Sequence, residues 1–227
     1  MMTASLPDGL RHIDCRTRDK PNAYIVDDGA ITLVDAGWPG DEATVRDSLR
    51  DADIGPGDID RVLLTHYDAD HVGTLSRLTP ELDAPVYVHR LEAPYVAGNR
   101  LPPWTARHGI EALHRLYYRR LTLPDLPIRS VEDGDTVGDL RVYHTPGHTP
   151  GHVVYLHEDL SAAFLGDLVY GLGDRLRPSG RISSYDTGRV TDSIESLCDR
   201  TEGFRYACPG HGPPLEGGHD LLSSIVG

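Results

Sequence analysis

The segment that most constrains the fold covers residues 63–73, where a short apolar run leads into a cluster of histidines and aspartates. Within six residues it carries four potential metal ligands: His66, Asp68, Asp70 and His71. Imidazole and carboxylate groups are the side chains that hold zinc, iron or manganese. A strand that ends in such a cluster fixes the ligands at its carboxyl edge, where active sites of layered α/β folds lie. The segment therefore predicts a metal site at the edge of a sheet.

A second interpretation of these residues needs no metal. Asp68 or Asp70 would cap the amino terminus of a helix over residues 71–78, with the first helical turn in solvent. Other parts of the chain favour the metal, because further ligand-type residues stand beside glycine and proline in turns: His148 within 145–152, Asp167 after the apolar residues 164–166, and His211 within 208–212. Such turns are rigid, and a rigid turn fixes a ligand in place before the metal arrives.

Together these motifs resemble those of the metallo-β-lactamase-fold hydrolases, the family that includes glyoxalase II and lactonases. The family pattern is His-x-His-x-Asp-His, then a His, an Asp and a His, with an earlier Asp that closes a strand. That earlier Asp is Asp35, within residues 32–37, and the resemblance runs from about residue 10 to about residue 215. It implies an α/β fold, a four-layer αββα sandwich, formed as one domain over residues 1–227.

The resemblance also implies two divalent metal ions and assigns their ligands by position. The first ion would take His66, Asp68 and His148; the second would take Asp70, His71 and His211; and Asp167 would bridge the two. Asp35 and His152 would lie behind these ligands and orient them.

Position 68 departs from the family pattern, which has a histidine where this chain has Asp68. If Asp68 binds, three carboxylates surround the metals, and the less positive site lowers the pKa of bridging water less strongly. A carboxylate also suits harder ions, so zinc is expected first, with iron or manganese compatible. Flavodiiron proteins of this fold carry a glutamate there and hold iron, which resembles this arrangement. Alternatively Asp68, which is shorter than a histidine, turns away and leaves the first site weak.

The implied reaction is the cleavage of a small ester, thioester or lactone by a hydroxide that bridges the two metals. Asp70 is the candidate catalytic residue, because it can bind one metal and also pass a proton to the leaving group. Two alternatives remain open: a di-iron redox enzyme, prompted by Asp68, and a metal-binding protein without turnover. A fold by itself does not specify the substrate.

Two segments are expected to border the substrate pocket. Residues 90–123, with aromatic side chains between 95 and 118, predict either a helical lid over the metals or an amphipathic helix whose aromatics complete the core. The stretch from Asp167 to a helix at 188–199 is rich in arginine, and Tyr185 and Arg181 are the candidate substrate contacts. The same arginines are equally compatible with solvated charges in a glycine-rich loop.

Composition limits the partners. The net charge of -13 disfavours nucleic acid, whose phosphates attract basic surfaces, and leaves a small-molecule substrate. No run approaches the ~20 apolar residues of a membrane span, and the first seven residues lack a signal-peptide pattern. Three cysteines at no metal or redox spacing fit a reduced, cytoplasmic setting. The surface expected from many aspartates and a single lysine, Lys20, resembles that of proteins from salt-loving cells.

Apolar periodicity and turn residues give the expected elements. Strands are predicted at 10–17, 22–27, 30–35, 61–65, 85–89, 127–132, 139–145, 152–156, 161–166 and 205–208. Helices are predicted at 41–51, 71–78, 111–120, 188–199 and 218–225.

Overall fold

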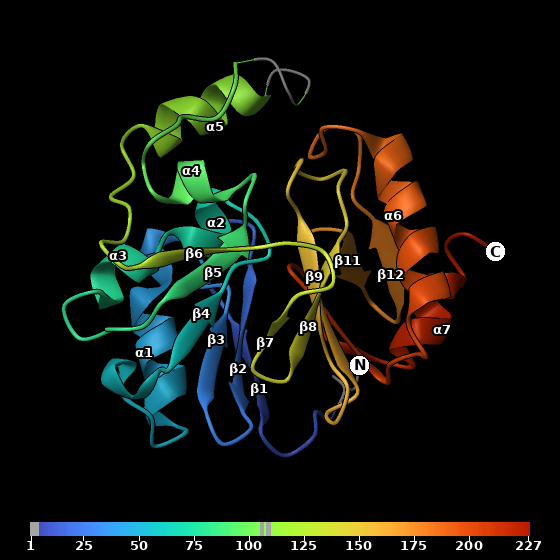
Figure 1. Ribbon diagram of the computed structural model, residues 1–227, viewed down its shortest axis with the longest axis horizontal. Coiled ribbons are helices and arrows are strands. Elements are labelled where there is room, and N and C mark those ends of the chain that lie inside the picture. The colour runs from blue at the N-terminus through green and yellow to red at the C-terminus, as the bar shows by residue number, and fades with distance from the viewer. Residues whose placement is uncertain (1–4, 105–106, 108–109) are drawn as a thin grey trace.

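The computed structural model describes residues 5–104, 107 and 110–227. Residues 1–4 lie outside the described residues, and with them part of the segment that we expected to lack a signal peptide. Residues 105–106 and 108–109, within the expected lid, also lie outside them. The described residues form two facing β-sheets with helices on both outer sides (Figure 1).

The first sheet has six strands in sequential order. The first three pair antiparallel, and the third to the sixth pair parallel. The strands are β1 (Leu10–Asp14), β2 (Asn22–Asp27), β3 (Ile31–Val34), β4 (Arg61–Leu63), β5 (Val86–His89) and β6 (Ile128–Val131).

The second sheet also has six strands, in the order β14-β13-β10-β9-β8-β7, and only its β10–β13 pair is parallel. Its strands are β7 (Thr136–Val137), β8 (Leu140–His144), β9 (Val153–His157), β10 (Ala162–Gly166), β13 (Tyr206–Pro209) and β14 (Leu215–Glu216). A separate hairpin consists of β11 (Val169–Leu172) and β12 (Arg175–Pro178).

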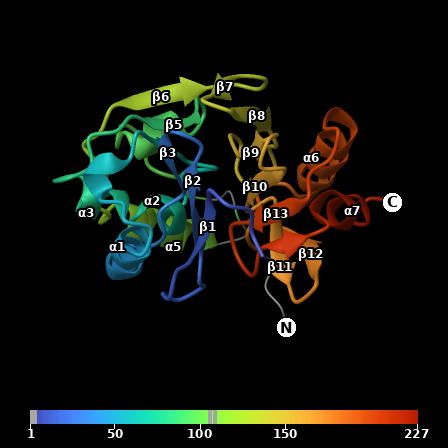
Figure 2. The same cartoon turned by 90° about the horizontal axis from the view of Figure 1, so that it is seen from below.

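Helices cover the outer faces of the two sheets, and the view from below shows the layers end-on (Figure 2). On the side of the first sheet these include α1 (Glu42–Arg50) and α3 (Leu75–Leu78), and on the side of the second α6 (Thr187–Arg200) and α7 (Gly218–Ser223). The remaining helices are α2 (Ala69–Val72), α4 (Ala93–Val96), α5 (Ile110–Tyr118) and the 3-10 turns η1 (Pro39–Asp41) and η2 (Pro56–Asp58). None of the described helices is long and apolar enough to cross a membrane.

Strand β2 shows why the sheets lie between two other layers. Ala23 and Ile25 pack into the core beneath the first layer of helices, whereas Tyr24 and Val26 pack into the core between the sheets. Successive side chains of a strand point to opposite faces, so a strand that is apolar on both faces must be covered on both. A third core packs the second sheet against α6 and α7. Three cores separate four layers, and the predicted αββα sandwich is confirmed.

The short elements β7, β14 and α4 were not predicted from the sequence. Two other segments also differ from the prediction. The expected helix over 71–78 is divided into α2 and α3, and Gly73 between them lies where an added Cβ would collide with Pro39. The expected loop after Asp167 contains the β11–β12 hairpin. Its period-two pattern is short, with Leu176 buried between the exposed Arg175 and Arg177, and the charged residues conceal it in the sequence.

Candidate metal centre

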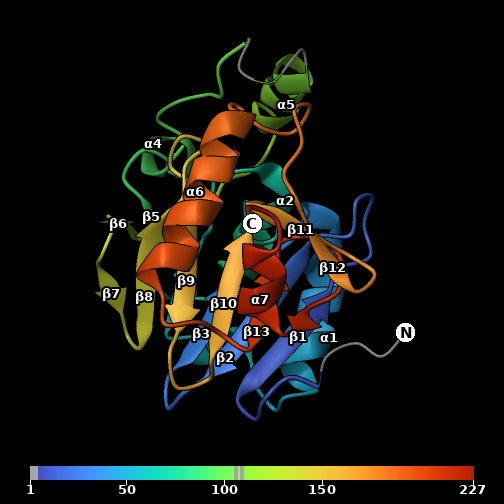
Figure 3. The ribbon, with the colours of Figure 1, turned by 90° about the vertical axis from the view of Figure 1, so that its right-hand side faces the viewer.

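The ligand-type side chains come from four loops that meet at one edge of the sandwich. These loops follow β4, β8, β10 and β13 in the chain, and α5 lies over the same edge (Figures 1 and 3). Strands β10 and β13 run parallel, so their carboxyl ends lie side by side and bring the loops of Asp167 and His211 together. The structure thus gathers residues that are up to 145 positions apart, since His66 and His211 belong to the same site.

The segment after β4 leads into helix α2, but no side chain caps the amino terminus of this helix. Asp68 is the N-cap residue of α2, yet its side chain accepts no capping hydrogen bond. It faces two histidines instead: Asp68 Oδ2 lies 3.1 Å from His148 Nε2 and 3.5 Å from His66 Nε2. The carboxylate therefore points into the site, and the capping interpretation of Asp68 is wrong.

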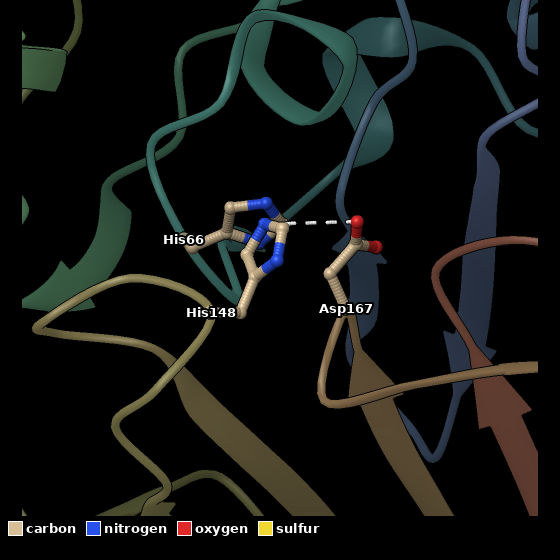
Figure 4. Close-up of side chains that lie close together, drawn as sticks. All are labelled: His66, His148 and Asp167. Carbon is tan, nitrogen blue, oxygen red and sulfur yellow. Dashed lines mark ion pairs between the residues drawn. The ribbon is translucent and has the colours of Figure 1, made fainter. Parts of the chain in front are cut away.

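The first group of ligands consists of His66, His148 and Asp167, with donor atoms within 4.8 Å of one another. Figure 4 shows the two imidazoles facing the carboxylate, with a dashed line between His148 and Asp167, whose Nε2 and Oδ2 atoms are 3.6 Å apart. Asp68 Oδ2 stands against the same two Nε2 atoms. The residues assigned to the first ion are therefore brought together.

The second group consists of Asp70, His71 and His211, again with donor atoms within 4.8 Å. Asp70 Oδ2 is 3.3 Å from His211 Nε2 and 3.6 Å from His71 Nε2. Asp167 touches this group as well, because its Oδ1 lies 3.3 Å from His71 Nε2 and its Oδ2 lies 3.4 Å from His211 Nε2. Asp167 thus lies between the two groups, as a bridging ligand must.

The geometry of the four histidines fits metal ions. Ligand atoms bonded at about 2.0–2.2 Å to a tetrahedral ion stand roughly 3.3–3.6 Å apart, which is close to the spacings found here. His66 Nε2, His71 Nε2 and Asp167 Oδ1 are buried and have no hydrogen-bond partner. Each histidine holds its other nitrogen, Nδ1, against a neighbouring oxygen, which leaves Nε2 facing inward: His66 on Thr65, His71 on Asp35, His148 on Ser179 and His211 on the Asp19 carbonyl.

Asp35 and His152 support the ligands from behind. Asp35 Oδ2 lies 2.9 Å from His71 Nδ1, and the same carboxylate accepts hydrogen bonds from the backbone and hydroxyl of Thr65. His152 Nε2 accepts the backbone N–H of Asp167 at 3.1 Å, and its Nδ1 lies 2.8 Å from the Thr145 hydroxyl. Burial holds the pKa of His152 well below its usual range, so the ring is the neutral acceptor that this contact requires.

Two glycines allow the ligand loops to approach closely. Gly166 has φ +47°, and an added Cβ there would lie 2.6 Å from His152 Nε2. At Gly210 an added Cβ would collide with Asp167 Oδ1 and lie 2.9 Å from His71 Cε1. Any larger residue at position 210 would therefore displace the carboxylate between the two ligand groups.

Glu92, which the sequence did not indicate, ties two ligand loops together. Its Oε1 accepts the backbone N–H of Gly151 at 2.6 Å, and its Oε2 accepts that of Tyr67 at 3.2 Å. The side chain is fully buried, and burial, with the nearby Asp68 carboxylate, raises the pKa of Glu92 to about 7. Each of these loops contributes a histidine to the first group, so Glu92 fixes their separation.

Arg107 is the second residue that sequence reasoning missed. Its guanidinium binds Asp68 through two hydrogen bonds, Nη1 to Oδ2 at 2.6 Å and Nη2 to Oδ1 at 3.2 Å. Burial by itself would raise the pKa of Asp68, but the Arg107 charge, together with the neighbouring His114, His66 and His148, holds that pKa well below the usual range. Arg107 stands in no recognisable motif, so only its position in the fold reveals the contact.

A cavity of about 950 Å³ opens over the ligands. Its floor includes Asp68, Asp70, His148, Asp167 and His211, and one wall is apolar, formed by Trp38 together with Leu113 and Tyr117 of α5. The segment expected to be a lid thus borders the cavity, while its Tyr95 and Tyr118 are buried in the core beneath the first layer of helices.

The two candidate substrate contacts lie elsewhere. Tyr185 is not among the residues that line this cavity. Its hydroxyl lies 2.8 Å from the Tyr67 hydroxyl and donates a hydrogen bond to the Glu111 carboxylate at 3.2 Å. Arg181 is exposed and does not line the cavity either. From the same part of the chain, Tyr170 on β11 and Ser183 line the cavity.

Comparison with known proteins agrees with this site. The profile of the Metallo-beta-lactamase superfamily matches residues 16–223. The chain belongs to this superfamily. Among curated members, it is 29% identical over 213 residues to the probable metallo-hydrolase YybB of Bacillus subtilis (strain 168), covering 92% of this chain and 84% of that protein.

Two further similar proteins bear on the chemistry. The chain is 29% identical over 159 residues to a hydroxyacylglutathione hydrolase of Bdellovibrio bacteriovorus, covering 68% of this chain but only 51% of that protein. A solved structure of TTHA1623 in a di-iron-bound form superposes with a TM-score of 0.68 and 26% identity, over 92% of this chain and 95% of that one. Of these relatives, one is named a probable metallo-hydrolase and one a hydroxyacylglutathione hydrolase, and the solved structure holds two iron ions.

Proposed function

We propose that this protein is a binuclear metal-dependent hydrolase of small esters, thioesters or lactones. The observation that carries the proposal is the pair of His/Asp groups that meet at Asp167 on the floor of the cavity. The first ion would be held by His66, Asp68 and His148 and the second by Asp70, His71 and His211, with Asp167 shared. When bound, the two ions would polarise a carbonyl group and lower the pKa of water between them.

Asp70 is the residue that we assign to proton transfer. It lines the cavity, and the Nε2 atoms of two histidines, His71 and His211, lie within 3.6 Å of its Oδ2. Burial opposes its ionisation, yet the charges of His71 and His211 prevail and lower the pKa of Asp70. Asp70 is therefore ionised at neutral pH. With Oδ2 holding the second ion, its other oxygen, Oδ1, would accept a proton from the attacking water and then return it to the leaving oxygen or sulfur.

The walls of the cavity favour a substrate with an apolar portion. Trp38 and Tyr117 meet edge to face with ring centroids 5.1 Å apart, and Leu113 is 69% exposed beside them. Exposed apolar side chains grouped beside a reactive centre are typical of a binding surface. The hydroxyacylglutathione hydrolase among the relatives has an acyl group in its named substrate, which supports an acyl compound here.

The test is hydrolysis of a panel of esters, thioesters and lactones by zinc-loaded protein. Asp70→Ala is expected to lower kcat/KM by about 100-fold or more, because a positioned acid or base contributes roughly 10²–10⁴-fold. Asp47→Ala, which removes an exposed carboxylate of α1 paired with Arg50, is the matched control and should retain full activity. Full activity in Asp70→Ala would disprove the assignment.

A di-iron redox enzyme is the second candidate, favoured by the di-iron form of TTHA1623. The residues present would suit either metal, since imidazole and carboxylate ligands bind both zinc and iron. Metal analysis of anaerobically purified protein separates the two. A stoichiometric pair of iron ions without hydrolysis of any panel member would favour the redox enzyme, whereas zinc with turnover supports the hydrolase.

A further inference from the structure

The buried ion pair between Asp68 and Arg107 has no counterpart in the ligand pattern of the superfamily. Asp68 is 6% exposed and Arg107 4%, and the pair is bidentate. Asp68 Oδ2 serves two neighbours at once, because it receives Arg107 Nη1 and also faces the Nε2 atoms of His66 and His148. Arg107 also lines the cavity, and it lies three residues before Ile110, where helix α5 begins.

The surroundings of Arg107 hold it in this position. Its Nε lies 3.5 Å from Glu111 Oε2, and its guanidinium stacks over the Tyr185 ring at 5.0 Å. Glu111 in turn accepts hydrogen bonds from the hydroxyls of Tyr67 and Tyr185, and it lies 3.5 Å from His114 Nδ1. Two carboxylates thus face two basic groups in a buried network, so the guanidinium is fixed by more than its contact with Asp68.

The charges explain how an aspartate is accommodated at position 68. A histidine ligand is neutral, whereas Asp68 adds a third carboxylate to Asp70 and Asp167. The sequence alone therefore predicted a site with one negative charge more than usual. Arg107 removes that excess, because an aspartate with a bound guanidinium has the same net charge as a neutral histidine. The expected weaker acidification of bridging water does not follow once Arg107 is counted.

We propose that Arg107 is the charge partner of Asp68 and a positioning residue of the first metal site, so that the two side chains together replace one histidine ligand. Arg107 keeps Oδ2 aimed at His66 and His148 and cancels the added charge. The proposal rests on the metal site of the proposed function but on no particular substrate. It predicts that Asp68 and Arg107 are interdependent. When either residue is replaced alone, the charge of the other is left without its partner and destabilises the site.

A double-mutant cycle with Asp68→His and Arg107→Met tests this directly. Zinc affinity is measured by competition with a chromophoric chelator, zinc per chain by mass spectrometry, and stability by the Tm of metal-free protein. Asp68→His alone removes the carboxylate that binds Arg107 in a bidentate manner and leaves its cation, now facing only Glu111, close to the first ion; we expect at least a tenfold loss of zinc affinity there. Adding Arg107→Met is expected to restore that affinity and to raise the Tm.

In the otherwise unchanged protein the same Arg107→Met substitution should have the opposite effect on stability. It leaves Asp68 buried without its cation and lowers the Tm of metal-free protein. Zinc should then raise the Tm by more than it does in the wild type, because the ion replaces the missing charge. A purely structural role would lower the Tm in both backgrounds, so the reversal of sign is the decisive readout.

The matched control is Arg119→Met, which removes an exposed arginine just after α5 and should change neither zinc affinity nor the cycle. The proposal is overturned if the effects of the two substitutions simply add, or if Asp68→His alone binds two zinc ions as tightly as the wild type. Turnover is not a readout, so a failed panel of substrates would refute the proposed function and leave this result standing.

Discussion

The contact between Asp35 and His71 gives the sharpest prediction about the second metal site. A carboxylate only accepts hydrogen bonds, so Asp35 Oδ2, 2.9 Å from His71 Nδ1, fixes the proton on Nδ1 and leaves Nε2 free to bind a metal. Asp35→Asn keeps the shape of the side chain but reverses which nitrogen of His71 must carry the ring proton. With its oxygen accepting the Thr65 N–H, the new amide nitrogen would donate to His71 Nδ1 and move the ring proton to Nε2.

The expected magnitude follows from these contacts. The opposite amide orientation would set two donors, the amide nitrogen and the Thr65 N–H, against each other. Moving the His71 ring proton from Nδ1 to Nε2 costs less free energy than that clash. Loss of a group that orients a metal ligand typically costs 10–100-fold in metal affinity, or about 1.4–2.7 kcal/mol. The backbone adds no further cost, because Asp35 has φ +55° and asparagine adopts that region as readily as aspartate.

The assay is zinc competition against a chromophoric chelator, with unfolding in denaturant to measure stability. Asp35→Asn should weaken the second site 10–100-fold. Asp41→Asn is the matched control: Asp41 is also buried and accepts backbone hydrogen bonds from Arg16 and Thr17, but it touches no ligand. It should lower stability and leave zinc affinity unchanged. Zinc affinity within twofold of the wild type in Asp35→Asn would refute the tautomer argument.

Three further predictions follow from the site and its surroundings. Burial, with the stacked His144 ring adding to it, lowers the pKa of His89 to about 4, so the neutral ring stabilises the fold above about pH 6.5, its unfolded pKa. The free energy of unfolding should fall as the pH drops from about 6.5 to about 4, and His89→Phe should flatten that slope. Gly210→Ala should displace Asp167 and reduce zinc per chain below two, measured by mass spectrometry. Leu113→Ser should raise KM for substrates with long acyl chains several-fold and leave kcat unchanged, measured by steady-state kinetics.

The Gly210 and Leu113 predictions each have a matched control in the chain. Gly180→Ala meets no atom within 4 Å of the added Cβ and should bind zinc normally. Leu116→Ser changes an exposed leucine of α5 that does not line the cavity, so KM should stay the same. An unchanged pH slope in His89→Phe, two zinc ions in Gly210→Ala, or equal KM values for Leu113→Ser and wild type would contradict the corresponding prediction.

Local sequence was sufficient for most of the strands and for the nature of the ligands, but it did not indicate β7, β11, β12 or β14. Strand β2 alternates between two apolar faces, and the ligand cluster follows β4 directly, so period and residue type carry the information within a few positions. The β11–β12 hairpin escaped because its charged residues conceal the alternation. The aromatic segment at 95–118 allowed two interpretations, and the structure uses both, with Tyr95 in the core and Tyr117 at the cavity.

The sequence by itself determined that this chain forms a sandwich of the metallo-β-lactamase type and which histidines and aspartates stand in its ligand motifs. The tertiary structure decided the electrostatic state of that site. Arg107 lies 39 residues from Asp68 and in no motif, yet the fold buries its guanidinium against that carboxylate. The physical reason is that the energy of a charge depends on its burial and on the charges around it, and those are set by the packing of distant segments.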